Sequence, residues 1–141
     1  MSRVWTGSCQ CGAVKFKATA DPIRVVNCHC GMCRRASGAA FYTHVHFPID
    51  RFEWIGSEPT RYSTSPNAER GFCNTCGSTT TMHETVLPDR VQVALGMLDR
   101  PEDVQPDDHV WVSSQMPWLT VEDDLPKFET ISSAVPSDAG E

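Results

Sequence analysis

The sequence predicts a mainly β domain of short strands, held together by cysteines that bind metal. Short segments in which apolar and polar residues alternate recur along the chain, as expected of half-buried strands. Turn residues separate these segments, and almost none of the sequence has the 3.6-residue period of a long helix. Seven cysteines occur in the arrangements C-x-C, C-x-C-x-x-C and C-x-x-C. These features together favour a small β fold held by a zinc knuckle.

The expected elements follow in chain order. A glycine-bounded turn at 7–12 carries the first two cysteines, and helical turns are expected at 34–39 and 101–104. Residues 68–83 surround the C-x-x-C motif and are expected to form two strands joined by a metal knuckle. The other short strands are expected where apolar residues alternate or β-forming residues cluster: 14–18, 23–27, 41–47, 52–55, 91–96 and 109–112.

The segment 41–47 alternates most clearly. One face would carry four residues, which are Phe41, Thr43, Val45 and Phe47. The opposite face would carry Tyr42, His44 and His46. We expect this second face to be half-exposed, although a histidine there could also act as a proton shuttle near neutral pH.

Length and composition indicate one domain. The 141 residues are enough for a single core, and we expect one zinc-binding domain over 1–131 followed by a polar tail at 132–141. The net charge of −6 and the lack of a basic run argue against nucleic acid as a partner. No apolar leader segment opens the sequence and no apolar run approaches 18 residues, so we expect a cytoplasmic protein without a membrane partner. The oligomeric state is not predicted.

The stretch Cys28-His29-Cys30-Gly31-Met32-Cys33 organises the chain. An odd number of cysteines in a cytosolic protein argues against a disulfide framework and favours metal binding. Side chains at i and i+2 of a strand share a face, so Cys28 and Cys30 can aim at one point. A left-handed Gly31 would turn the chain and bring Cys33 back to the same point. Three thiols are one short of a closed tetrahedral zinc site, which leaves one coordination position for a substrate.

The remaining four cysteines can form a second group. Cys9 and Cys11 with Cys73 and Cys76 would make a four-thiol structural site that closes a long loop. Spacing alone leaves another division open. In that division Cys9 and Cys11 would join Cys28 and Cys30, and the remaining three cysteines would come from separated elements.

Three motifs resemble a known family. They are Gly7-Ser8-Cys9-Gln10-Cys11-Gly12-Ala13-Val14, Asn27-Cys28-His29-Cys30-Gly31-Met32-Cys33-Arg34-Arg35 and Gly71-Phe72-Cys73-Asn74-Thr75-Cys76-Gly77-Ser78. A fourth likeness joins His109-Val110-Trp111 to Met116-Pro117-Trp118-Leu119. The chain resembles the glutathione-dependent formaldehyde-activating enzymes, which share their domain with centromere protein V, over about 7–128. The resemblance implies short, mostly antiparallel sheets in a β-tent (Mss4-like) fold. It also implies a structural zinc on Cys9, Cys11, Cys73 and Cys76, and a catalytic zinc on Cys28, Cys30 and Cys33.

The resemblance also implies a reaction. The family adds the thiol of glutathione to formaldehyde to give S-hydroxymethylglutathione, and in reverse acts as a carbon–sulfur lyase. Three thiolates already donate to the +2 ion, which makes it a weak Lewis acid, so we favour presentation of a substrate thiolate over activation of the carbonyl. Two other functions stay open. One is a non-enzymatic zinc-binding module, and the other is a redox sensor that uses the C-x-C-x-x-C thiols.

Several other residues have candidate roles. Arg34 and Arg35 could pair with a carboxylate of glutathione, or could neutralise the thiolates. We expect His29 to point away from the metal, as part of a pocket wall or the surface. His109 precedes an apolar strand end and could reach the site. Trp118 is expected in the core or a pocket wall. The acidic run 122–124 is expected to be a turn.

Overall fold

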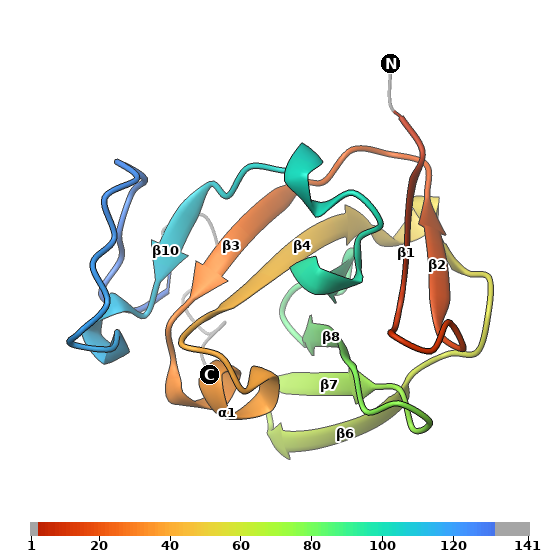
Figure 1. Cartoon of the computed structure of the whole chain (residues 1–141), viewed down its shortest axis with the longest axis horizontal. Helices are drawn as coiled ribbons and strands as arrows, with labels where there is room; N and C mark the ends of the chain where they lie inside the picture. The colour runs from red at the N-terminus through yellow and green to blue at the C-terminus, as the bar shows by residue number, and fades with distance from the viewer. Residues whose placement is uncertain (1–2, 132–141) are drawn as a thin grey trace.

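The computed structural model describes residues 3–131, and the predicted tail at 132–141 lies outside the described residues. Ten strands form two sheets, which confirms the mainly β class. The smaller sheet is antiparallel and has the order β1-β2-β5, with β1 at Trp5–Ser8, β2 at Lys15–Ala18 and β5 at Phe52–Trp54. Figure 1 shows this sheet standing beside the larger one.

The larger sheet contains seven strands. Their order is β10 (Asp108–Val110), β3 (Arg24–Cys28), β4 (Tyr42–Pro48), β9 (Arg90–Ala94), β8 (Thr79–Glu84), β7 (Ala68–Phe72) and β6 (Thr60–Ser65). All neighbours are antiparallel except β10 and β3, which are parallel. The sheet turns strongly between β4 and β6 (Figure 1), as the twist of successive strands allows.

Helical structure is limited to short segments among the described residues. The α-helix α1 spans Gly31–Ser37, and four 3₁₀ turns are η1 (Ile49–Arg51), η2 (Leu95–Met97), η3 (Pro101–Asp103) and η4 (Val112–Ser114). Among residues 3–131, no helix has the length and apolar composition needed to span a bilayer.

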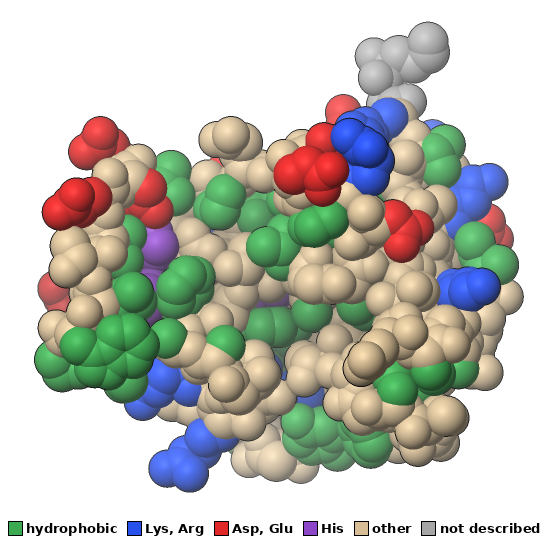
Figure 2. All heavy atoms as spheres, viewed as in Figure 1, with side chains coloured by type: hydrophobic (Ala, Val, Ile, Leu, Met, Phe, Trp, Pro, Cys, Tyr) green, Lys and Arg blue, Asp and Glu red, His purple; other side chains and the backbone are tan. Residues whose placement is uncertain are grey.

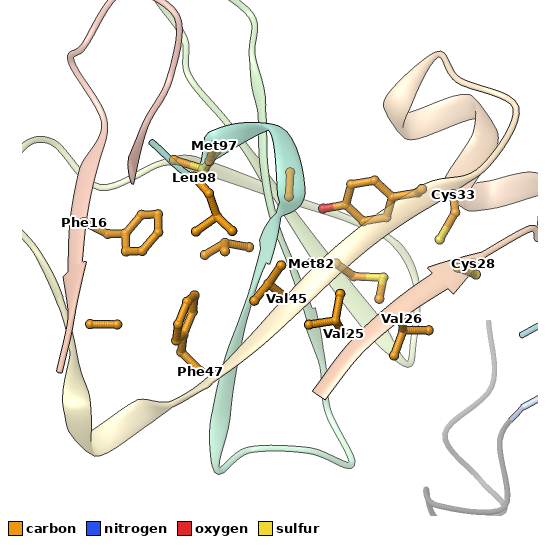
Figure 3. Packing of buried hydrophobic residues seen from close by; sticks show 14 of the residues in the cluster. Phe16, Val25, Val26, Cys28, Cys33, Val45, Phe47, Met82, Met97 and Leu98 are labelled. Atoms are coloured by element: carbon orange, nitrogen blue, oxygen red, sulfur yellow. The ribbon is translucent and has the colours of Figure 1, made fainter. Parts of the chain in front are cut away.

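The apolar core lies between the two sheets. Phe16 of β2 packs on Phe47 of β4 with ring centroids 5.8 Å apart, and both are essentially inaccessible to water. Val45 and Val93 extend the same layer along β4 and β9. Figure 3 shows this layer continuing from Phe16 towards the cysteines at the far end of β3. The core therefore reaches directly to the cysteine cluster.

The second face of β4 departs from expectation. Tyr42, His44 and His46 are buried, whereas the alternation predicted a half-exposed face. The reason is that β4 is an interior strand of the curved sheet. Arg24 on β3 and Gln92 on β9 lie directly opposite His46 and shield this face from water.

Some boundaries also differ from the prediction. The helix begins at Gly31 rather than at residue 34, and Gly31 is not left-handed, because the helical turn itself brings the cysteines together. Strands β1 and β6 were not predicted, since neither has a clear apolar alternation. The last strand ends at Val110 rather than at residue 112, because Trp111 is left-handed with φ 60° and η4 follows.

Candidate functional site

The three-cysteine group lies where β3 leads into α1. Cys28 is the last residue of β3, Cys30 is the N-cap of α1, and Cys33 lies in its first turn. Cys30 has extended backbone, and its Sγ accepts a hydrogen bond from the Cys33 backbone N–H at 3.2 Å. A thiol thus takes the place of the usual capping oxygen. The three Sγ atoms lie within 4.8 Å of one another, and all three residues are buried.

The environment favours a thiolate at Cys30. Hydrogen bonds from the Cys28 thiol and then the Cys33 thiol lower the pKa of Cys30 to about 2, against the opposing effect of burial. The bond with Cys30 raises the pKa of Cys28 well above its usual value. Arg70 of β7 adds a positive charge here, because its Nη2 donates to Cys33 Sγ at 3.5 Å. The group is therefore poised to lose protons when a cation binds.

The other four cysteines form a second group. Cys9 and Cys11 lie in the turn between β1 and β2, and Cys73 and Cys76 lie in the connection between β7 and β8. Their four Sγ atoms lie within 4.8 Å of one another. The division that joins Cys9 and Cys11 to Cys28 and Cys30 is therefore not the one that the structure adopts.

The sulfur distances in the four-cysteine group fit a tetrahedral ion, and the three-cysteine group is close enough to hold one as well. Tetrahedral zinc with Zn–S bonds of about 2.3 Å would place its sulfurs about 3.8 Å apart. Cys9 Sγ lies 3.6 Å from Cys11 Sγ, which lies 3.7 Å from Cys73 Sγ. Backbone N–H groups of Val14 and Thr75 point at the Cys9 and Cys73 sulfurs, as expected around thiolates. Within residues 3–131, no histidine or carboxylate joins either group, so the three-cysteine group has no fourth protein ligand.

A chain of hydrogen bonds runs behind the three-cysteine group. His29 Nε2 lies 2.8 Å from His109 Nδ1, and His109 Nε2 lies 2.7 Å from Asp123 Oδ2. Burial, followed by the positive charges of His109 and Arg34, lowers the pKa of His29 to about 4. His29 is thus buried in a hydrogen-bonded chain rather than lying at the surface, and His109 does reach the neighbourhood of the site.

Asp123 is the residue of this chain that the sequence analysis missed. It was assigned to a simple turn, yet it accepts from a buried histidine while its own side chain stays 41% exposed. The acidic side chains around it gather at the left end of the molecule in Figure 2, over the segment that follows β10. The only trace of this pair in the sequence was a histidine, His109, followed 14 residues later by an acidic residue, and no local pattern connects the two.

A second histidine pair lies on β4. His44 Nδ1 lies 2.9 Å from His46 Nε2, and Arg90 Nη1 lies 3.3 Å from His46 Nδ1. The rings of Tyr42, His44 and His46 stack in succession, with centroids 5.3 Å and 4.9 Å apart. Burial, followed by the charges of Arg24 and Arg70, lowers the pKa of His44 to about 3.

The two predicted arginines have different surroundings. Arg34 Nη1 donates to the carbonyls of His29 and Ser114, both at 2.7 Å, and so ties the end of β3 to η4. Arg35 is exposed. It lies in a pocket of about 370 Å³ next to the three-cysteine group, together with Met32, Ala36, Tyr62, Thr64 and Arg70.

Trp118 does not belong to this site. Its side chain is 71% exposed, so the expectation that it lies in the core or a pocket wall is wrong. The reason is that the chain beyond η4 forms no further helix or complete strand up to residue 131 and lies at the edge of the sheet, outside β10 (Figure 1).

Comparison with known proteins agrees with this arrangement. A family model described as glutathione-dependent formaldehyde-activating enzyme matches residues 4–114. The chain belongs to the glutathione-dependent formaldehyde-activating enzyme family. A Halomonas elongata protein that carries this family's name on a provisional basis is 28% identical over 130 residues, which cover 82% of this chain and 80% of that protein.

Two further proteins are similar to this chain, and their descriptions name no substrate. A Schizosaccharomyces pombe protein, described as an uncharacterized lyase, is 32% identical over 78 residues, or 53% of this chain and 54% of that protein. The crystal structure of a Rhodobacter sphaeroides protein superposes with a TM-score of 0.56 at 25% identity, and covers 72% of this chain and 91% of that one. The descriptions of the Halomonas and Schizosaccharomyces proteins together suggest an enzyme of this family.

Proposed function

We propose that this protein is a zinc-dependent enzyme that adds a thiol to an aldehyde, with glutathione and formaldehyde as the first substrates to test. The observation that carries the proposal is the group of three buried thiols without a fourth protein ligand in the described chain. A purely structural site would be expected to complete its own tetrahedron. The open position favours an enzyme over a binding module.

The seven cysteines would divide between two zinc ions. Cys9, Cys11, Cys73 and Cys76 would hold a structural ion, and Cys28, Cys30 and Cys33 would hold the second. When bound to three thiolates, zinc lowers the pKa of an incoming thiol and so supplies the nucleophile as a thiolate. The reaction product would be S-hydroxymethylglutathione, and the reverse reaction would be carbon–sulfur lysis.

The pocket beside α1 supports a substrate with carboxylates. Arg35 and Arg70 both line it, and Arg70 also contacts Cys33 Sγ. A guanidinium pairs well with a carboxylate, and glutathione has two. Arg34 has a different place in this proposal, because its Nη1 already holds two backbone carbonyls. We therefore assign substrate binding to Arg35 first.

The first experiment is a calorimetric titration of zinc-replete protein with glutathione, cysteine and S-methylglutathione. We expect saturable binding of glutathione that disappears when its sulfur is methylated, because the methylated sulfur cannot become a thiolate. Binding of all three with equal affinity would point instead to a module that recognises the amino and carboxylate groups that the three ligands share. Binding of none would exclude glutathione as the cosubstrate.

The matched variant is Cys30→Ser. We expect two zinc ions per chain in the wild-type protein and one in the variant, since the four-cysteine group is untouched. The variant should also lose thiol binding while remaining folded. A fully active Cys30→Ser protein would refute the assignment of the catalytic site.

A further inference from the structure

Two side chains of β4 stand beside the three-cysteine group on the same face of the sheet. Tyr42 lies directly opposite Cys28 in the β3–β4 ladder, and His44 is the next residue along that face. His44 and Cys28 are therefore diagonal cross-strand neighbours, within reach of each other's side chains. The Tyr42 and His44 rings stack at 5.3 Å with an interplanar angle of 30°. Both residues are buried, at 4% and 3% exposure.

The hydrogen-bond chain behind His44 fixes which of its nitrogens carries the proton. The Arg90 guanidinium can only donate, so His46 Nδ1 accepts from it. A neutral His46 then carries its proton on Nε2 and donates to His44 Nδ1. Because its Nδ1 accepts this bond, His44 must carry its own proton on Nε2. No hydrogen bond within the described chain uses that N–H, so His44 offers a donor on the face of β4 that also carries Tyr42.

The Tyr42 hydroxyl is also without a partner. Its oxygen is buried and makes no hydrogen bond. Buried polar groups are nearly always hydrogen-bonded, and an exception calls for an explanation such as a ligand that completes the bond. Two neutral donors, one from each ring of a stacked pair, thus stand next to the proposed thiolate site with no acceptor.

We propose that the Tyr42 hydroxyl and the His44 Nε2–H bind the oxygen of the carbonyl substrate, and that His46 and Arg90 are positioning residues. This inference rests on the proposed function. The sulfur lone pair of the thiolate forms the new C–S bond, and the π pair of the carbonyl moves onto oxygen. The resulting alkoxide accepts hydrogen bonds from both donors. Water then supplies the proton that replaces the one the thiol lost.

The two donors should act on the reaction rate rather than on the affinity for the thiol. Donors that meet an oxygen only as it gains negative charge stabilise the transition state more than the substrate. They should therefore raise the rate of addition without tightening the binding of the thiol. The same pair would stabilise the alkoxide in the reverse, carbon–sulfur lysis direction, because both directions share one transition state.

The test uses Tyr42→Phe, which removes a single hydroxyl, and His44→Phe, which keeps a flat ring in the stack. Exchange between ¹³C-formaldehyde with glutathione and the hydroxymethyl adduct is followed at equilibrium by NMR magnetisation transfer. We expect each variant to lower kcat by about 100-fold, the usual effect of losing one such donor. Thiol affinity by calorimetry and zinc content should match the wild-type protein. His44→Gln, which retains an N–H donor, should recover part of the rate.

The two positioning residues, His46 and Arg90, are tested by a separate variant. Arg90→Met removes the donor that fixes His46, so the His44 proton is free to move to Nδ1. We expect a smaller fall in kcat with KM unchanged, and a changed ¹⁵N spectrum in which His44 Nε2 loses its proton-bearing signature. The matched control is His83→Phe, because His83 lies on β8 in a different pocket, lined also by Trp54 and Glu69. It should leave the rate and the His44 signals unchanged.

The outcomes separate this inference from the function beneath it. If the wild-type protein does not accelerate exchange, the proposed function fails and the donor pair fails with it. If the wild-type protein accelerates exchange and Tyr42→Phe and His44→Phe match its rate, the enzyme stands and the donor pair is refuted. A loss of rate that comes with loss of zinc or of thiol binding would also refute it, because the two residues would then be structural.

Discussion

At the scale of single residues, the two histidines of β4 make stability depend on pH. Burial keeps the pKa of both His44 and His46 below the usual value of 6.5. The charges of Arg24 and Arg70 lower the pKa of His44 further. Those of His44, Arg90 and Arg24 do the same at His46. The unfolded chain takes up protons at these positions below about pH 6.5, whereas the folded chain does not. The stabilisation is therefore complete above that pH and falls as the solution becomes more acidic.

The expected slope is at most about 1.4 kcal/mol per pH unit for each histidine below pH 6. The variant His46→Gln removes one of the two groups, so its free energy of unfolding should fall less steeply between pH 7.5 and 5.0. Denaturant unfolding of both proteins at three pH values measures the difference. Protonation of the cysteines and loss of metal affect both proteins alike and cancel in that difference. Parallel curves would contradict neutral burial of His46.

At the scale of elements, Gly7 controls how β1 meets the rest of the molecule. A Cβ at this position would lie 2.3 Å from the backbone oxygen of Met97 and 2.4 Å from the Phe16 ring. Because a backbone oxygen cannot move cheaply, Gly7→Ala should force β1 away from η2. We expect a loss of about 1–3 kcal/mol in the free energy of unfolding, as is usual for overpacking.

The matched control for this change is Gly96→Ala. Gly96 lies in η2 itself, next to Met97, but a Cβ there would meet no atom within 4 Å, and its φ is not positive. Its unfolding free energy should stay within about 0.5 kcal/mol of the wild-type value. Thermal and urea unfolding of the two variants gives the comparison. Equal losses in both would show that the contact with Met97 does not set the position of β1.

The elements also show what the sequence could predict. The cysteine spacings and the alternation at 41–47 predicted a mainly β fold and the positions of most strands, because both signals are local. The burial of His44 and His46 was not predictable in the same way. A two-residue period shows that two faces exist, but whether the polar face is covered depends on Arg24 and Gln92, which register brings alongside from other strands.

The candidate site shows the same limit. Cys28, Cys30 and Cys33 are close in sequence, so their convergence was predictable, although a capped helix rather than a left-handed glycine produces it. His29 and His109 are 80 residues apart in the chain, and His109 and Asp123 are 14 apart. The parallel pairing of β10 with β3 brings His109 to His29, and the bridge between His109 and Lys127 brings the segment of Asp123 alongside.

At the scale of the whole molecule, the two cysteine groups differ in which parts of the fold they join. Cys9 and Cys11 lie in the turn that joins β1 to β2 of the three-stranded sheet, while Cys73 and Cys76 lie in the connection between β7 and β8 of the seven-stranded sheet. A zinc ion on these four would therefore join the two sheets directly. Cys28, Cys30 and Cys33 all lie at one junction of β3 and α1, so an ion there closes no long loop.

This difference predicts an order in which metal is lost. The three-cysteine ion, with one position open to solvent or a chelator, should leave first and with little change in the thermal midpoint. The four-cysteine ion should leave more slowly, and its loss should uncouple the sheets. We expect Cys76→Ser to cost about 4 kcal/mol or more in unfolding free energy and Cys30→Ser about 1 kcal/mol.

Zinc release into a colorimetric chelator, recorded together with circular dichroism, tests this order. Two phases should appear, the first silent in circular dichroism and accompanied by loss of thiol binding, the second accompanied by unfolding. A single phase in which both metals and the fold are lost together would mean that the two groups are one cooperative unit. In that case the open site would owe its geometry to the four-cysteine group, and a substitution in either group would abolish activity by unfolding the chain.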